Sequence, residues 1–232
     1  MEVMIMATTI YEYCNNNRIK VKIPEGFYFK EGEIDEGLVI ENEHGDSFVR
    51  IPPGYTSDGV YVRGFWISAY YISKGEDGQA HSISGDYPWT EISFYEAKEV
   101  AEKFGGELLT SEEYNRICMW LVQTHAVSFE QMFIDGSGMG SYCNPFKLEK
   151  NGANPNWAAN NIDCFWGNVY TWTTQRSELY EHYRKIRGGT CPIHGTEICQ
   201  PPSASAWAVP EKGSTTISFS IVLHDIFEED ED

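Results

Sequence analysis

The residues with the most reactive side chains lie close together near the C-terminus, in the stretch RGGTCPIHGTEICQPPSASAW from Arg187 to Trp207. This stretch contains Cys191, His194 and Cys199, and its apolar residues follow neither a helical nor a strand period. Thiolate and imidazole groups bind soft metals, and a thiolate beside a histidine can act as a nucleophile. Four interpretations are therefore open: a metal site, a catalytic cysteine, a disulfide loop or a displayed binding surface.

Each of the three chemical interpretations lacks support elsewhere in the sequence. Cys191, His194 and Cys199 would supply three metal ligands, but no fourth ligand follows at a recognisable spacing, and there is no C-x-x-C pair nearby. A nucleophilic cysteine needs a base beside it; His194 and His182 are candidates, but nothing in the sequence fixes their geometry. A disulfide between Cys191 and Cys199 requires an oxidising compartment. We predict no metal and keep these interpretations as alternatives.

The composition narrows the class of partner. The chain has 232 residues and a formal net charge of -18, and it stays acidic when the final stretch DIFEEDED is set aside. An acidic surface repels phosphate groups, which disfavours nucleic acids and anionic membranes. No stretch approaches the ~20 apolar residues of a membrane span, and the N-terminal stretch MEVMIMATTIYEYCNNN lacks the pattern of a signal peptide. We therefore expect reduced cysteines and no insertion into a membrane.

The first third of the chain predicts short strands. Residues 19–40 alternate apolar and polar side chains around the turn-forming residues Pro24-Glu25-Gly26 and Glu36-Gly37. The same pattern continues through residues 48–74, where Pro52-Pro53-Gly54 marks another turn. This part of the chain is therefore expected to be rich in β-structure.

Two helices are predicted next. The first begins at Ser93 as its N-cap, has apolar residues at spacings of three and four, and ends at Gly105. The second begins at Thr110, and Glu113 three residues later completes a capping box. Cys118 lies on the apolar face of this second helix, which indicates a core residue.

Beyond His125 the sequence predicts about forty irregular residues. The stretch DGSGMGS, residues 135–141, has no lysine where a phosphate-binding loop requires one, and we interpret it as a turn. The stretch NGANPNWAANN, residues 151–161, consists of residues that favour turns, and its side-chain and backbone oxygens could coordinate calcium. Plain turn chemistry is the simpler interpretation, and a structural calcium ion is the alternative.

Five stretches then form an ordered pattern: FVRIPPGYTSDG, VYVRGFWISAYYIS, YPWTEISFYEAKEVAEKFGGELLTSEEY, WGNVYTWTTQ and KIRGGT. In this order they resemble the landmarks of the formylglycine-generating-enzyme family, also called the sulfatase-modifying-factor family, from Phe48 to Leu223. The resemblance implies an α+β, C-type-lectin-like fold with small twisted antiparallel sheets, two helices and long irregular loops. Gly167 and Asn168 would form a tight turn, and Trp172 would be buried.

The chemical residues of that family do not follow its fold landmarks. In the family, a copper-binding cysteine pair that oxidises a substrate cysteine follows an RGGS-like motif, which residues 187–190 match. Here Cys191 comes immediately after the motif and Cys199 eight residues later, whereas the family's pair begins later and is five apart. Cys164 and Thr171 replace two further family residues. We predict that the protein is not an enzyme, with a copper-dependent oxidase as the main alternative.

The C-terminal part also resembles the variable proteins of diversity-generating retroelements, in which a similar scaffold displays a binding surface. Gly188 and Gly189 would anchor that surface, and the stretches 203–207 and 217–223 fit its outline. The resemblance implies a receptor-binding or adhesion-type protein on a virion or cell surface, with a protein or cell-surface ligand. A purely structural particle protein is a third class.

The residues predicted to bind the ligand combine large rings with adaptable hydrogen-bonding groups, as in antibody paratopes. They are Tyr180, His182, Tyr183, Cys191, Ile193, His194, Thr196, Glu197, Gln200 and Trp207. The expected organisation of the whole chain has three parts. A β-rich extension over residues 1–45 packs on a C-type-lectin-like domain over residues 46–224, and a solvated acidic tail covers residues 225–232.

Overall fold

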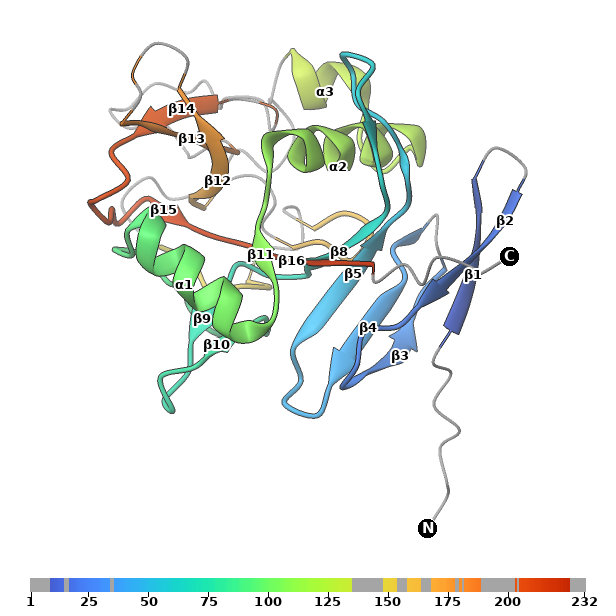
Figure 1. The fold of residues 1–232 in the computed structure, drawn as a ribbon, viewed down its shortest axis with the longest axis horizontal. Helices are drawn as coiled ribbons and strands as arrows, with labels where there is room; N and C mark the ends of the chain where they lie inside the picture. Colours follow the sequence, from blue (N-terminus) through green and yellow to red (C-terminus); the bar gives the residue numbers. More distant parts are fainter. Residues whose placement is uncertain are drawn as a thin grey trace, which may run out of the picture.

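The computed structural model describes part of the chain in detail, and the arrangement of its elements is drawn in Figure 1. The described residues are 9–14, 17–33, 36–134, 148–153, 158–163, 168–177, 180, 182–188, 203 and 205–225. None of the helices in these ranges combines the length and the hydropathy that crossing a bilayer requires.

The largest sheet of the described chain has six strands in the order β11-β16-β8-β5-β4-β3, and each neighbouring pair is antiparallel. β16 comes from the C-terminal end of the chain but lies inside the sheet, between β8 and β11. β3 and β4, from the predicted N-terminal extension, form one edge. The strands are β3 (Phe27–Glu31), β4 (Val39–Asn42), β5 (Ser47–Ile51), β8 (Phe65–Ser68), β11 (Glu107–Leu108) and β16 (Ile221–His224).

A second sheet has the order β14-β13-β12-β15, and its β12–β15 pair is parallel. Its strands are β12 (Tyr170–Arg176), β13 (Arg184–Arg187), β14 (Ser205–Ala208) and β15 (Ile217–Ser218). Three two-stranded hairpins complete the β-structure of the described residues. They are formed by β1 (Thr9–Cys14) with β2 (Asn17–Lys22), β6 (Gly54–Tyr55) with β7 (Tyr61–Val62), and β9 (Ser73–Lys74) with β10 (Ala80–His81).

The two predicted helices are confirmed, together with their caps. In α1 (Phe94–Phe104) the Ser93 hydroxyl accepts a hydrogen bond from the backbone amide of Glu96, and Gly105 ends the helix at a φ of 95° that favours glycine. α2 (Ser111–Gln123) begins with the expected capping box at Thr110.

A third, short helix, α3 (Phe129–Phe133), lies where the sequence predicted an irregular segment, so that prediction is wrong for these residues. Its own capping box explains it, because the Ser128 hydroxyl accepts a hydrogen bond from the Gln131 amide at 3.1 Å. The buried side chain of Met132 then attaches this turn of helix to the core.

The six-stranded sheet is covered on both faces. Successive residues of a strand point to opposite faces, and in β5 Val49 belongs to the core cluster on the side of α2 while Phe48 belongs to the cluster on the side of α1. Ile67 and Trp66 of β8 divide in the same way. The central strands are consequently buried from both sides.

Trp172 of β12 ties the second sheet to α1. Its side chain is fully buried, its indole N–H donates to the Ile92 carbonyl at 3.1 Å, and its ring meets that of Phe94 edge-on at 6.1 Å between centroids. A buried indole needs such a partner because an unpaired N–H is costly. The small sheet is therefore fixed to the body through one large aromatic side chain.

A buried ion pair holds the end of the described chain. The guanidinium of Arg50 on β5 donates to both carboxylate oxygens of Asp225, at 2.7 and 2.8 Å, and it lies over the Trp66 ring at 5.4 Å. The two side chains are 1% and 8% exposed. Asp225 was expected in a solvated tail. That expectation is wrong for this residue, because a buried arginine requires a buried counter-charge.

We predict that Asp225→Ala lowers the free energy of unfolding by about 3–5 kcal/mol, since it leaves the Arg50 guanidinium buried without its carboxylate. Urea denaturation followed by circular dichroism measures this loss. Glu102→Ala is the matched control, because the Glu102–Lys98 pair on α1 is exposed and should contribute at most ~1 kcal/mol. Equal losses in the two variants would contradict the structural role of the buried pair.

Candidate binding surface

β13 and β14 position the two ends of the segment predicted to bind. The strands pair from Arg184 opposite Ala208 to Arg187 opposite Ser205, so the chain leaves β13 and enters β14 at the same end of the sheet. The amide of Ser203 donates to the Met132 carbonyl at 3.2 Å, which places the approach to β14 beside α3. The segment between is therefore anchored at both ends.

Several predicted site residues lie outside the described residues. They are Gly167, Gly189, Cys191, Ile193, His194, Thr196, Glu197 and Gln200. The others are placed by the structure: Asn168 just before β12, Trp172 on β12, Tyr180, His182 and Tyr183 in the turn between β12 and β13, Gly188 directly after β13, and Trp207 on β14.

The turn between β12 and β13 presents two tyrosines. Tyr180 is 61% exposed, and its ring lies 5.4 Å from that of Tyr183. The turn is held by its own hydrogen bonds, because the Tyr183 amide donates to the Tyr180 carbonyl at 2.8 Å and the Ser177 hydroxyl accepts from the Tyr180 amide at 3.1 Å. His182 between them is exposed as well. The geometry gives a small, preorganised aromatic surface.

Trp207 lies on the outward side of the small sheet. It is 40% exposed, and it stands opposite Lys185 of β13, whose ammonium is 5.8 Å from the ring centroid. Its neighbours Ala206 and Ala208 point to the other side of β14 and pack against the core. An exposed tryptophan on an edge strand is the kind of residue that dominates protein interfaces.

The opposite side of β13 is used for anchoring. The Arg184 guanidinium lies 4.7 Å from the Phe94 ring centroid, and burial lowers the pKa of this arginine. The end of the strand is fixed to α2, because the Arg187 guanidinium lies 4.7 Å from the Tyr114 ring centroid and donates to the Asn115 side chain. Gly188 follows at a φ of 88°, a backbone angle that residues other than glycine rarely adopt.

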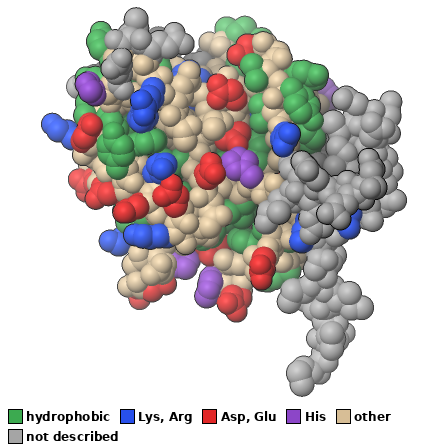
Figure 2. Space-filling model, in the orientation of Figure 1, with side chains coloured by type: hydrophobic (Ala, Val, Ile, Leu, Met, Phe, Trp, Pro, Cys, Tyr) green, Lys and Arg blue, Asp and Glu red, His purple; other side chains and the backbone are tan. Residues whose placement is uncertain are grey.

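An aromatic hairpin that packs beside α2 was not among the predicted site residues. Tyr55 and Tyr61, on β6 and β7, are exposed and meet edge-on at 5.4 Å. Figure 2 shows hydrophobic side chains gathered where Figure 1 draws this hairpin and α3. The Thr56 hydroxyl is the main cause of a lowered pKa at Asp58 in the turn, and the charges of Arg187 and Lys185 add to it. The sequence signal that could have indicated this aromatic hairpin was a tyrosine on each side of the Ser57-Asp58-Gly59 turn.

The described residues place no reactive thiol in this region. Cys118, as predicted, is a buried core residue on α2, and burial raises the pKa of its thiol to about 12. Among the residues that the structure describes, no group of three histidine, cysteine or acidic side chains is arranged to hold a metal ion. The cysteine pair of the C-terminal segment lies outside these ranges.

In the described part of the asparagine-rich stretch, the side-chain amides form hydrogen bonds to other parts of the chain. The Asn151 amide donates to the Tyr71 carbonyl at 2.7 Å and to the Ser73 hydroxyl at 3.1 Å. Asn160 and Asn161 both have positive φ, as turn residues do, and Asn161 donates to the Gly37 carbonyl at 2.7 Å. Asn168 closes a neighbouring turn by two hydrogen bonds to the Glu149 backbone. The calcium hypothesis stays a prediction.

Comparison with known proteins identifies the fold. No family model and no curated protein matches the chain. Among solved structures, PvdO from Pseudomonas aeruginosa has a TM-score of 0.53 at 16% identity, covering 80% of this chain and 97% of its own. CarF has a TM-score of 0.56 at 13% identity, covering 78% and 98%. The fold is C-type-lectin-like, of the formylglycine-generating-enzyme type.

A third solved structure extends the likeness over nearly the whole chain. The Major Tropism Determinant M1 variant has a TM-score of 0.51 at 12% identity, and it covers 95% of this chain and 72% of its own. At such identities the likeness is one of fold. The predicted fold class is thereby confirmed, with α3 as an additional helix.

We predict that iodoacetamide does not label Cys118 in the native protein at neutral pH, because only the thiolate reacts and the buried thiol stays protonated. Mass spectrometry of the peptide that contains Cys118 measures the labelling. The same reaction in urea is the control and should label this residue fully. Labelling of Cys118 in the native state at the rate seen in urea would show that the thiol is accessible.

Proposed function

We propose that the protein binds a ligand through a variable C-terminal surface carried by its C-type-lectin-like scaffold. Two exposed aromatics carry the proposal: Tyr180 in the turn between β12 and β13, and Trp207 on β14. The strands β13 and β14 of the same small sheet hold both ends of the segment 189–202. Exposed aromatic side chains give large contact area at low entropic cost. The surface comprises the turn 180–183, this segment and Trp207.

The division of labour within β13 and β14 supports this proposal. Arg184 and the two alanines of β14 face the body, where Arg184 contacts the Phe94 ring and the alanines pack against the core, and Arg187 at the end of β13 contacts α2. Lys185 and Trp207 face outward. Residues that fix the scaffold are therefore distinct from residues available for recognition, as a surface that varies without unfolding requires.

The expected partner is a protein or cell-surface ligand, and the expected place is a virion or cell surface. The Major Tropism Determinant, whose M1 variant shares this fold, is by its name a protein whose variants determine tropism. A receptor-binding or adhesion role for this chain agrees with that name. The formal charge of -18 favours a partner that is not itself strongly acidic.

The proposal includes diversification by a retroelement. We predict that the genome encoding this chain contains, near its gene, a reverse transcriptase and a template repeat matching the segment from about Tyr170 to Leu223. Sibling copies should differ at positions where the template has adenine. Genome sequencing of related isolates measures this. A gene without such a repeat, and without variation in this segment among isolates, would contradict diversification.

The competing hypothesis is a copper-dependent oxidase of the same fold, which would use Cys191 and Cys199. Because their spacing differs from that of the family's pair, we predict no tight Cu(I) binding that depends on them. Competition with a chromogenic Cu(I) chelator measures the affinity of the native chain and of Cys191→Ser with Cys199→Ser. Tight binding in the native chain that is lost in the variant would favour the oxidase over the binding protein.

A further inference from the structure

A groove of about 750 Å³ opens away from the C-terminal surface. It is bordered by the residues that lead into β3, the turn between β4 and β5, the β9–β10 hairpin and the last turns of α1. In Figure 1 these elements lie at the lower end of the molecule, whereas β13 and β14 lie at the upper end. The groove is thus distinct from the proposed recognition surface.

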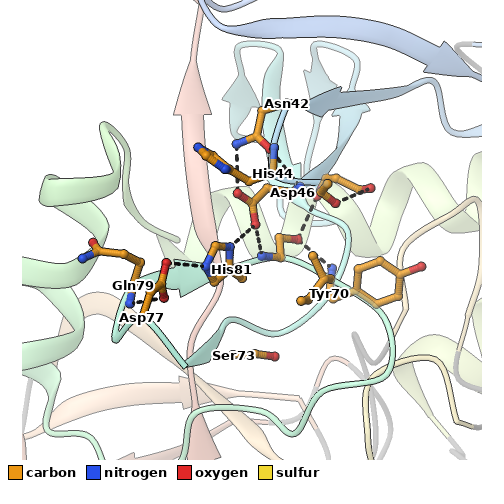
Figure 3. A network of polar contacts seen from close by, with 12 residues as sticks. Asn42, His44, Asp46, Tyr70, Ser73, Asp77, Gln79 and His81 are labelled. Carbon is orange, nitrogen blue, oxygen red and sulfur yellow. Dashed lines mark hydrogen bonds and ion pairs between the residues drawn. The ribbon is translucent and has the colours of Figure 1, made fainter. Parts of the chain in front are cut away.

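The floor of the groove is built around Asp46. Its carboxylate is 2% exposed and accepts hydrogen bonds from the Asn42 amide at 2.9 Å and the Ser82 backbone N–H at 2.8 Å. Nδ1 of His81 lies 3.1 Å from the same carboxylate (Figure 3). The ring of His44 faces that of His81 edge-on at 6.5 Å. These contacts fix the shape of the floor.

The rim of the groove carries exposed carboxylates. Asp77 is 58% exposed and lies 3.5 Å from Nε2 of His81. The Gln79 backbone N–H donates to it at 2.8 Å and lowers the pKa of the carboxyl, which therefore stays ionised. Glu25 and Glu43 also line the groove, and Lys103 is the lysine of its lining. With Asp46, these carboxylates outnumber the two ammonium groups at the groove, those of Lys103 and of Lys74, which lies over the Trp89 ring.

The walls of the groove are aromatic. Phe27, Trp89 and Phe104 line it and are only partly buried. The ammonium of Lys74 lies 5.0 Å from the centroid of the Trp89 ring, so this indole already accepts an alkylammonium group from within the chain. A ring face beside carboxylates binds an organic cation better than a bare metal ion, because the apolar stem of the cation gains contact area.

We propose that this groove binds an alkylammonium group, with its apolar stem against Trp89 and Phe104 and its charge toward Asp77 and Glu43. Two sources share this chemistry: a lysine side chain presented by another protein, and a free polyamine. The apolar walls would contact the stem of the ligand, and the acidic rim would contact its ammonium group. An inorganic cation would use only the rim.

Nuclear magnetic resonance of the full chain tests the proposal through the imidazole signals of His44 and His81. Titration with N-acetyl-lysine methylamide should shift both signals, whereas that of His224, on β16, should not move. N-acetyl-norleucine methylamide is the neutral control of the same shape and should give no shift. Equal shifts of the His44 and His81 signals with the lysine and norleucine compounds would overturn the proposal. So would the absence of any shift with both the lysine compound and spermidine.

The variants Asp77→Asn and Glu43→Gln should each weaken binding of the lysine compound by roughly twofold to fivefold, in line with exposed ion pairs. Glu102→Gln is the matched control, since it removes one exposed charge from α1 and does not line the groove. An unchanged affinity in both groove variants would contradict the assigned rim. Preference for the lysine compound indicates a protein partner, and preference for spermidine indicates a free polyamine; either supports the site.

Discussion

The interior position of the last strand is the constraint on which the rest of the structure depends. β16 pairs with β8 and β11 inside a sheet that is buried on both faces, and the Arg50–Asp225 ion pair holds the residue that follows it. The chain between α3 and β16 therefore makes an excursion whose return point in the large sheet is fixed, and described residues along it, such as Ile162 and Val169, pack in the core. The small sheet β14-β13-β12-β15 occupies that excursion, with Trp172 buried against α1 as its attachment. The chain leaves β13 and enters β14 at paired ends of these two strands, with Arg187 opposite Ser205.

In the proposed function, residues that stabilise the small sheet and residues that would contact the ligand lie at different places on β13 and β14. One side of β13 carries Arg184 and Ile186 into the body, and the outward side carries Lys185 beside Trp207. Arg187 lies on the same side as Lys185 but is not directed to solvent, because it contacts Tyr114 and Asn115 on α2 at the end of β13. The exposed tyrosines lie on the β6–β7 hairpin, and just before this hairpin the Pro52 carbonyl accepts a hydrogen bond from Arg116 on α2 at 3.0 Å. In the proposed function they would form a constant border of the recognition surface.

Local signals made much of this fold predictable. The capping boxes at Ser93 and Thr110 determine where α1 and α2 begin, and the left-handed Gly105 determines where α1 ends, because each acts within four residues. The same signal at Ser128 marks α3, although the surrounding sequence has no helical period. Contacts between distant residues could not be read in this way. Nothing local to Arg50 indicates that its partner is Asp225, and nothing local to Trp207 indicates that its ring lies opposite Lys185. The groove around Asp46 and His81 likewise arises only when two separate hairpins meet.

Thermal unfolding of one multiple variant tests most directly whether scaffold and displayed segment are separable. In it, serine replaces the predicted ligand-binding residues of the segment: Cys191, Ile193, His194, Thr196, Glu197 and Gln200. We expect a cooperative transition within a few degrees of the native Tm, because each surface substitution changes stability by at most about 0.5 kcal/mol in either direction and the six changes partly cancel. Trp172→Ala, in contrast, should cost about 3–5 kcal/mol. If the multiple variant loses its cooperative transition, or loses as much stability as Trp172→Ala, the segment belongs to the core. That result would contradict its role as a displayed surface.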